Sequence, residues 1–313
     1  MTIDQLLTCT EQTITRNVPL IGTASEDVRQ YLFVEVPPPW PPKITDLFTE
    51  DLRAAYSDLL RTGASTKTHL IQPSPPHSVK DHRRVFFFHS PMGNIHEPFT
   101  KTEYLFPTQE LEWSLTSLIR GEDLGLDQFK VPTHPNQRDL FLCVHGNRDR
   151  CCGSVGVALF NQAQRILRNS PNIRLWQSSH LTGHRMSPTL VDFPDGRFYG
   201  HLGLSELENI ITEKKIGELL RRHYRGLSGL PKPLQVLEGA VFEQEGWGWR
   251  SQSFTYRAES EGNDATWVEI VSDRWVANGR VKKMPSVELG VSSCGNLGQF
   301  TPETLVELKI TPH

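Results

Sequence analysis

The sequence predicts a mixed α/β protein, and two features of the chain support this prediction. Short apolar runs rich in β-branched and aromatic residues, at 31–36 and 139–144, have the length of buried strands. Each run is followed by a segment with apolar residues at helical spacing, 51–60 after the first run and 153–167 after the second. Strands that alternate with helices are typical of sheets with parallel neighbours.

The same order of elements occurs twice before residue 230. The first pass has a strand at 31–36, a helix at 51–60, extended segments at 68–71, 84–88 and 103–106, and a helix at 109–120. The second pass has a strand at 139–144, a helix at 153–167, a strand at 173–177, a hairpin of 189–191 with 197–199, and a helix from Ser205. The repetition suggests a duplicated unit. Chance is the alternative, because many α/β domains have this order and only the order repeats.

The segment before the hairpin indicates which α/β fold the second pass adopts. Ser187-Pro188-Thr189-Leu190 leads directly into the hairpin and the last helix, as the chain does after the cis-proline of thioredoxin-like folds. A packed turn can hold an X-Pro bond cis because the trans preference is small, although a trans proline also occurs at strand starts. We therefore expect a thioredoxin-like domain at 126–229. It follows an N-terminal α/β half at 1–125 that is a candidate degenerate repeat.

A small β-rich domain of unknown role is expected at 235–313. Proline-containing residues 230–233 mark the boundary before it. Alternating or β-branched residues predict strands at 235–242, 253–257, 266–271 and 304–310. The segment has no motif that indicates chemistry.

Composition excludes several classes of protein. The chain has 313 residues, of which 37% are hydrophobic and 22% charged, and its net charge is -3. These values suit a globular protein, argue against disorder and give no support to nucleic-acid binding. The apolar runs are too short to span a membrane, and residues 1–16 are polar and contain acids, unlike a secretory signal or a transit peptide. A cytoplasmic location is expected, with neither nucleic acid nor membrane as a partner.

The cysteines point to metal or redox chemistry. There are five, and three of them lie within ten residues: Cys9, Cys143, Cys151, Cys152 and Cys294. A secreted disulfide framework would spread an even number through a small domain. An odd, clustered set in a large chain indicates a metal or redox site instead.

Two segments carry the candidate ligands. Cys143 and Cys152 bound one segment, nine residues apart, and His180 and His184 bound the other, four apart. Both segments follow consecutive strands of the second pass, so parallel strands would bring them to one edge of the sheet. Thiolates and imidazoles suit zinc or an iron–sulfur cluster. The wide cysteine spacing differs from a zinc knuckle and favours a two-iron unit, but spacing alone leaves zinc as an alternative.

These segments resemble a known family. Residues 143–152 and 178–185, followed by Ser187-Pro188-Thr189 and Pro194-Asp195-Gly196, are similar to the sucrase/ferredoxin-like family of thioredoxin-like [2Fe–2S] proteins. The resemblance covers roughly residues 20–225. It implies that a [2Fe–2S] cluster is held by two cysteines and two histidines, which are Cys143, Cys152, His180 and His184. No pair of acids can be singled out as a glycosidase dyad, so the "sucrase" in the family name has no independent support.

Two neighbours of these residues are assigned supporting positions. His145 forms a Cys-x-His box with Cys143, as in Rieske proteins. A Rieske site also needs a second box, Cys-x-x-His, and Val155 stands at the histidine position of such a box after Cys152. Cys151 is expected to be a thiol packed beside the site.

A thiol oxidoreductase would need a Cys-x-x-Cys motif at the start of the helix. The residues three positions before and after Cys152 are Asp149 and Val155, so the motif is missing.

Charge and ligand type together predict the function. Between residues 143 and 186 there are six arginines and one acid, a local net charge of +5. Arg165 and Arg168 suit a solvated helix face, whereas Arg148, Arg150 and Arg185 are expected to face the cluster or an acidic redox partner protein. Imidazole ligands make the core less negative, which raises the potential from about -400 mV towards the Rieske range. We expect an electron carrier with proton coupling through the imidazoles, rather than a substrate-converting enzyme. The alternatives are a structural zinc protein with the same ligands and a thiol oxidoreductase.

Overall fold

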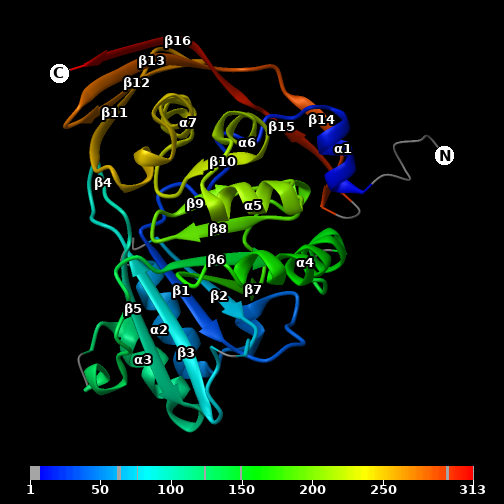
Figure 1. Cartoon of the computed structure of the whole chain (residues 1–313), viewed down its shortest axis with the longest axis vertical. Helices are drawn as coiled ribbons and strands as arrows, with labels where there is room; N and C mark the ends of the chain where they lie inside the picture. The colour runs from blue at the N-terminus through cyan, green and yellow to red at the C-terminus, as the bar shows by residue number, and fades with distance from the viewer. Residues whose placement is uncertain are drawn as a thin grey trace.

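The computed structural model describes residues 8–61, 65–75, 77–122, 125–148, 150–293 and 296–312. In this part of the chain the protein is mixed α/β, as predicted, and its largest element is a nine-stranded sheet. The strands of this sheet are β1 (Gln30–Glu35), β2 (Thr66–Ile71), β3 (His82–His89), β5 (Thr100–Pro107), β6 (Arg138–Cys143), β7 (Ile173–Ser178), β8 (Leu190–Phe193), β9 (Arg197–Tyr199) and β10 (Tyr224–Leu227). Their order across the sheet is β10-β9-β8-β6-β7-β2-β1-β3-β5 (Figure 1).

Two groups of four strands repeat one arrangement. In the first half, β1 pairs parallel with β2 and antiparallel with β3, and β3 pairs antiparallel with β5. In the second half, β6 pairs parallel with β7 and antiparallel with β8, and β8 pairs antiparallel with β9. Helices α2 (Glu50–Arg61) and α4 (Val157–Leu167) connect the parallel strands, and α3 (Leu111–Arg120) and α5 (Leu204–Thr212) follow the last strands. The element order predicted for both passes is confirmed.

The halves join where β2 and β7 end. Ile71 pairs with Ser178, and Ser179 both donates its N–H to the Leu70 carbonyl and accepts the Leu70 N–H at Oγ. Because β1 is parallel to β2 and β6 to β7, the carboxyl ends of all four strands converge at this junction. Loops from both halves therefore lie close together at this junction.

Aromatic stacking holds the two halves together. Phe33 of β1 stacks on Phe141 of β6 with ring centroids 3.7 Å apart, and Phe88 of β3 stacks on Phe193 of β8 at 4.1 Å. All four rings are fully buried. Burial of a phenylalanine contributes about 1.5–3 kcal/mol, so these cross-half contacts are a large part of the core. The Ser187–Pro188 bond that leads into β8 is cis, as predicted.

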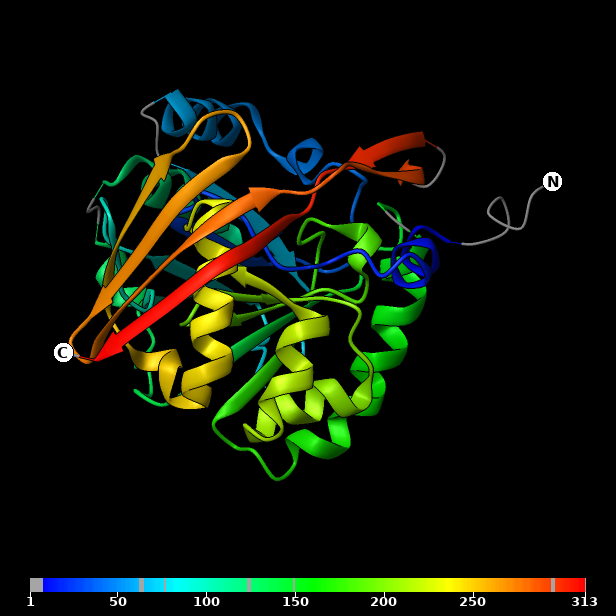
Figure 2. The same cartoon turned by 90° about the horizontal axis from the view of Figure 1, so that it is seen from above.

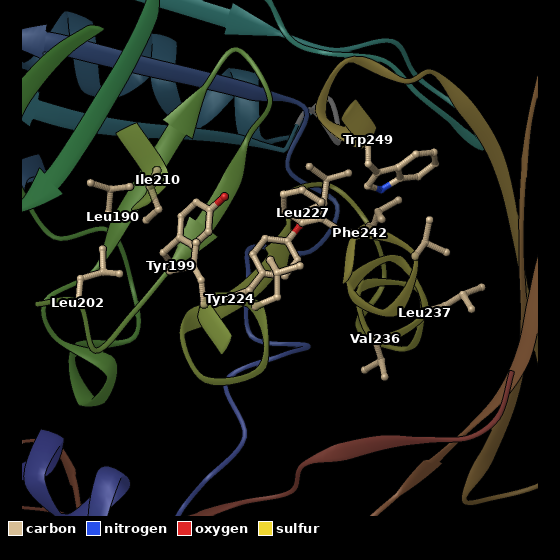
Figure 3. Packing of buried hydrophobic residues seen from close by; sticks show 14 of the residues in the cluster. Leu190, Tyr199, Leu202, Ile210, Tyr224, Leu227, Val236, Leu237, Phe242 and Trp249 are labelled. Carbon is tan, nitrogen blue, oxygen red and sulfur yellow. The ribbon is translucent and has the colours of Figure 1, made fainter. Parts of the chain in front are cut away.

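Residues 235–242 are helical, and the strand predicted there is wrong. They belong to α7 (Lys232–Glu245), which has a proline in its first turn. Leu234, Leu237 and Val241 are buried at helical spacing, but Val236 and Phe242 are buried as well. Figure 3 shows side chains of α7 extending in different directions from its axis. A helix that is covered on several sides has apolar residues on more than one face, so the 3.6-residue period of an amphipathic helix is not visible in its sequence.

The C-terminal strands cover α7. The smaller sheet has the order β16-β13-β12-β11-β4, and α7 lies between it and the β10 end of the large sheet (Figures 1 and 2). Its strands are β4 (Ile95–His96), β11 (Phe254–Ser260), β12 (Ala265–Ser272), β13 (Trp275–Lys283) and β16 (Glu303–Pro312); β14 (Val287–Ser293) and β15 (Asn296–Phe300) form a separate pair. The segments predicted at 253–257, 266–271 and 304–310 are confirmed as strands. Since β4 comes from the first half, this sheet is not built from the C-terminal segment alone.

A buried acid ties α7 to the second half of the large sheet. Glu238 accepts hydrogen bonds from Arg197 at 2.7 Å, from the Tyr224 hydroxyl at 2.7 Å and from the Trp249 indole at 2.8 Å. A buried carboxylate is tolerated when it is paired and hydrogen-bonded in this way. Helices α1 (Cys9–Thr15) and α6 (Ile216–His223) complete the α-helices of the described ranges. None of the helices in the described ranges is long and apolar enough to cross a membrane.

Candidate metal centre

Cys143 and Cys152 are brought together by close packing of glycines. Cys143 ends β6, and Cys152 opens a π-helical turn, Cys152–Gly156, that continues into α4. A Cβ on Gly156 would lie 2.1 Å from the Cys143 carbonyl oxygen, and a Cβ on Gly153 would lie 2.5 Å from the Cα of Gly146. Only glycine permits these approaches, so the start of the helix packs directly on the end of β6.

The two histidines lie on a tightly turned loop after β7. Thr182 has φ 68° and Gly183 has φ 73°, so two consecutive residues are in the left-handed region. This turn brings His184 back towards His180, and their ring centroids are 6.2 Å apart. A non-glycine residue held at positive φ is uncommon and often marks a functional segment.

Three of the four predicted ligands form one compact set. The donor atoms of Cys143, Cys152 and His180 all lie within 4.8 Å of one another, with both cysteines buried and His180 partly buried. The cysteines of this segment form no disulfide bond. The Nδ1 atom of His180 is buried and has no hydrogen-bond partner among the described residues. His184 lies beside this set but is not a member of it.

The donor set has the chemistry of a soft-metal site. A hydrogen bond between the two thiol groups is the largest influence on Cys143, and it holds the pKa of the Cys143 thiol well below its ordinary value against the effect of burial. A lowered pKa favours the thiolate, which is the form that binds metal. Two sulfur atoms and an imidazole nitrogen in a buried site suit zinc or an iron–sulfur cluster. The residues present therefore fit such a group.

A loop of the first half covers this site. His145 accepts the His180 N–H at its Nδ1 atom, at 3.3 Å, and its ring meets the edge of Trp40 with centroids 5.7 Å apart. Asn147 donates to the Trp40 carbonyl oxygen at 2.8 Å. His145 thus contacts the ligand loop directly and lies outside the donor set, as does the buried Cys151.

Three buried or half-buried basic residues on this side of the molecule, two of them cations at neutral pH, were not indicated by any sequence pattern. Arg225 of β10 is 1% exposed, and burial lowers the pKa of its guanidinium to about 10. Burial also lowers the pKa of Lys67 to about 8 and that of His69 to about 3. Each residue lies far from the ligands in the sequence, so only tertiary structure brings it close.

The arginines of the ligand segment divide into exposed and buried groups. Arg148 and Arg150 are exposed in the ligand loop, and Arg148 donates to the carbonyl of Pro42. Arg174 instead is buried and bonded to Asp139 at 2.6 Å. The local net charge of +5 counted from the sequence therefore overstates the positive charge on the surface that a partner would contact. Arg165 and Arg168 are exposed, as predicted.

A pocket of about 530 Å³ opens beside the histidine loop. Its lining includes Gly183, His184 and Arg185 from the loop, Arg225 from β10, and Lys232 from the start of α7. This pocket gives the histidine side of the site a route to the surface.

Comparison with known proteins identifies the family. Residues 20–226 match the model of the sucrase/ferredoxin-like family. Three curated yeast proteins, each called altered inheritance of mitochondria protein 32, are also similar. That of Meyerozyma guilliermondii is 30% identical over 94 residues, covering 28% of this chain and 33% of the relative. Those of Clavispora lusitaniae and Debaryomyces hansenii are 25% and 24% identical, covering 39% and 42% of this chain.

The chain spans between one third and one half of these relatives, since the matches cover 33%, 49% and 45% of their lengths. No solved structure gives a significant match. The family match spans about two thirds of the chain and includes both ligand segments, and on this evidence the chain belongs to the sucrase/ferredoxin-like family.

Proposed function

We propose that the protein is an electron carrier with a [2Fe–2S] cluster held by Cys143, Cys152, His180 and His184. The observation that carries the proposal is the compact set of two thiols and one imidazole, with the ring of His184 next to that of His180. Their donor atoms are of the types that hold iron–sulfur clusters in proteins with mixed cysteine and histidine ligation.

The topology supports a thioredoxin-like unit around this site. The second half has the strand order β9-β8-β6-β7, with a cis-proline at Pro188 before β8. The first half has the same order and pairing directions, which supports the proposal that residues 1–125 and 126–229 are duplicated units. The continuous core between them favours describing the two as parts of one body.

The cysteine and histidine ligands would have different roles at a bound cluster. A bound cluster would supply one-electron redox chemistry, at a potential raised by its neutral imidazole ligands. Cys143 and Cys152 are buried, so they would hold the dry end of the site. His180 and His184 are partly exposed, so electrons would leave on their side, and proton uptake at the imidazoles would accompany reduction.

The proposed partner is a redox protein with an acidic surface. Arg148 and Arg150 are exposed in the ligand loop, and Arg185 lies next to His184 at the pocket. Opposite charges at such a surface accelerate association and orient the partner. Association would therefore weaken as salt is raised. The names of the yeast relatives refer to mitochondria, so the predicted cytoplasmic location is to be tested by cell fractionation.

Zinc is the second candidate, because a donor set this compact also suits one ion. Anaerobic purification followed by metal and sulfide analysis, visible absorption and EPR distinguishes the two. We expect iron and acid-labile sulfide in equal amounts, a coloured protein and an EPR signal after reduction. A colourless protein with bound zinc would overturn the proposal.

A further inference from the structure

Arg225 differs from the other buried arginines in its counter-charge. Four of them pair with carboxylates in the core: Arg84 with Glu103, Arg174 with Asp139, Arg197 with Glu238 and Arg250 with Asp195. Within the described ranges, no carboxylate forms an ion pair with Arg225, although it is 1% exposed. A buried charge is costly unless something compensates it.

The acidic groups that lie close enough to favour the charged form of Arg225 are Tyr31, Cys152 and Cys143. Burial raises the pKa of Tyr31 to about 12, so its phenol is neutral at physiological pH. Cys152 and Cys143 are the remaining acidic groups, and they would be negative in the thiolate form that binds metal. Lys67 is a second cation nearby, and its pKa is lowered by burial and by Arg225. Arg225 and Lys67 therefore form a pair of neighbouring cations in this part of the molecule.

Arg225 also holds the histidine loop. Its guanidinium donates to the Thr182 carbonyl at 3.2 Å, and on its other side to the carbonyl and hydroxyl oxygens of Thr23. The guanidinium packs over the Phe198 ring, 5.5 Å from its centroid. Arg225 thus connects the N-terminal segment to the turn between His180 and His184.

Gly183 is fitted to this arginine. A Cβ at this position would lie 2.7 Å from Nη2 of Arg225, and its φ of 73° already favours glycine. The loop therefore packs against the guanidinium with no space for a side chain. Movement of Arg225 would change the position of the residue that precedes His184.

We propose that Arg225 is a positioning residue of the metal centre, which fixes the His180–His184 loop through Thr182 and Gly183 and places a buried positive charge beside the group that this loop would hold. This inference rests on the proposed function, because it assumes that the four ligands hold a metal group. A positive charge beside the group stabilises its reduced, more negative state. Loss of that charge should lower the reduction potential.

The experiment compares three variants of the full-length protein purified anaerobically. Arg225→Met removes the charge and the fork of donors, and Arg225→Lys keeps the charge but loses the fork. Arg165→Met removes one exposed charge from α4 in the same half and serves as the control. Circular dichroism, iron and zinc content, redox titration and EPR are measured for each.

For Arg225→Met we expect at least a tenfold smaller ratio of reduced to oxidised protein at a fixed potential, a downward shift of about 59 mV. Arg225→Lys should keep most of the potential but show altered EPR lines, because the loop is no longer held at Thr182. Arg165→Met should match the wild type. Wild-type potential and EPR spectrum in Arg225→Met would overturn the inference.

Two further outcomes are decisive. If Arg225→Met does not fold, the Arg225→Lys variant provides the test. An EPR spectrum of Arg225→Lys that is identical to that of the wild type would then overturn the inference. If the wild type binds zinc instead of iron, the proposed function fails, but zinc affinity still tests Arg225. At least tenfold weaker zinc binding in Arg225→Met would support the role, and equal affinity would contradict it.

Discussion

The two halves of the large sheet share strand order and pairing, yet the candidate metal donors lie in the second half. In that half, the loops after the parallel strands β6 and β7 contain Cys143–Cys152 and His180–His184. In the first half, the loops after β1 and β2 contain the proline-rich segments 37–42 and 73–76 instead. One topology therefore supplies two pairs of loops at the junction of the halves, and within the described ranges only the pair in the second half carries the candidate donor set.

The loops of the first half have a structural role at the same junction. Trp40 packs on His145 and accepts a hydrogen bond from Asn147, and Gln72 donates its N–H to the Gln177 carbonyl. These contacts cover and support the ligand loops of the second half. The comparison suggests that one half of a paired fold can serve as the cover for a site in the other.

The largest expected effect is loss of the metal group when a cysteine is replaced. Cys143→Ser or Cys152→Ser should abolish or severely weaken binding, because oxygen replaces a soft thiolate. Visible absorption and iron analysis measure the loss. Cys151→Ser is the matched control, since Cys151 is buried next to Cys152 but lies outside the donor set. If Cys151→Ser lost iron while Cys152→Ser retained it, the assignment within the pair would be reversed.

The next effect tests the close packing of the turn before α4 on the end of β6 in the second half. In Gly156→Ala, the new methyl group would lie 2.1 Å from the Cys143 carbonyl oxygen. We expect a loss of about 1–3 kcal/mol or more in the free energy of unfolding, with weaker metal binding. Urea denaturation and metal content measure both.

Gly248→Ala is the control for this substitution, because no atom lies within 4 Å of the added methyl group. A stable Gly156→Ala protein with normal metal content would show that close packing of α4 on β6 is not needed for the site.

The third effect sharpens the assignment of the histidines. His180→Cys and His184→Cys should each retain a cluster but lower its potential, on the order of 100 mV, because a thiolate adds negative charge to the core. Redox titration measures the shift. The His184 variant is the more informative, since this residue lies outside the compact donor set. Unchanged potentials in both variants would exclude the histidines as ligands.

Local patterns predicted the strands and helices that the two halves repeat, because those elements alternate in buried, periodic segments, but they did not predict α1, β4, α6 or β10. The same patterns failed at α7, where Val236 and Phe242 are buried together with the residues of the main face. They located Cys143 and Cys152 through spacing and family resemblance. They did not indicate Arg225, because its contacts with Thr23 and Thr182 are between segments far apart in the sequence. They also did not indicate that Trp40 covers the site, because a proline-rich segment has the sequence pattern of a connecting loop.

The smallest effect tests how the first half is attached to the C-terminal sheet through β4. His96 of β4 is buried against Phe254 with ring centroids 4.8 Å apart, and burial lowers the pKa of His96 from 6.5 to about 3. Between pH 6.5 and 3 the unfolded chain therefore binds a proton that the folded protein excludes. Stability must fall as pH falls through this window, with this residue contributing up to about 1.4 kcal/mol per pH unit.

Urea denaturation of wild type and His96→Gln between pH 7 and 5 measures this contribution. The variant should lose less stability per pH unit below about pH 6.5, because glutamine does not titrate. His134→Gln, which changes an exposed histidine elsewhere in the protein, is the matched substitution. Equal slopes for wild type and His96→Gln would mean that His96 is accessible to protons in the folded protein. In that case the junction of β4 and β11 would open more readily than its burial suggests, and the first half would be less firmly attached to the C-terminal sheet than to the second half.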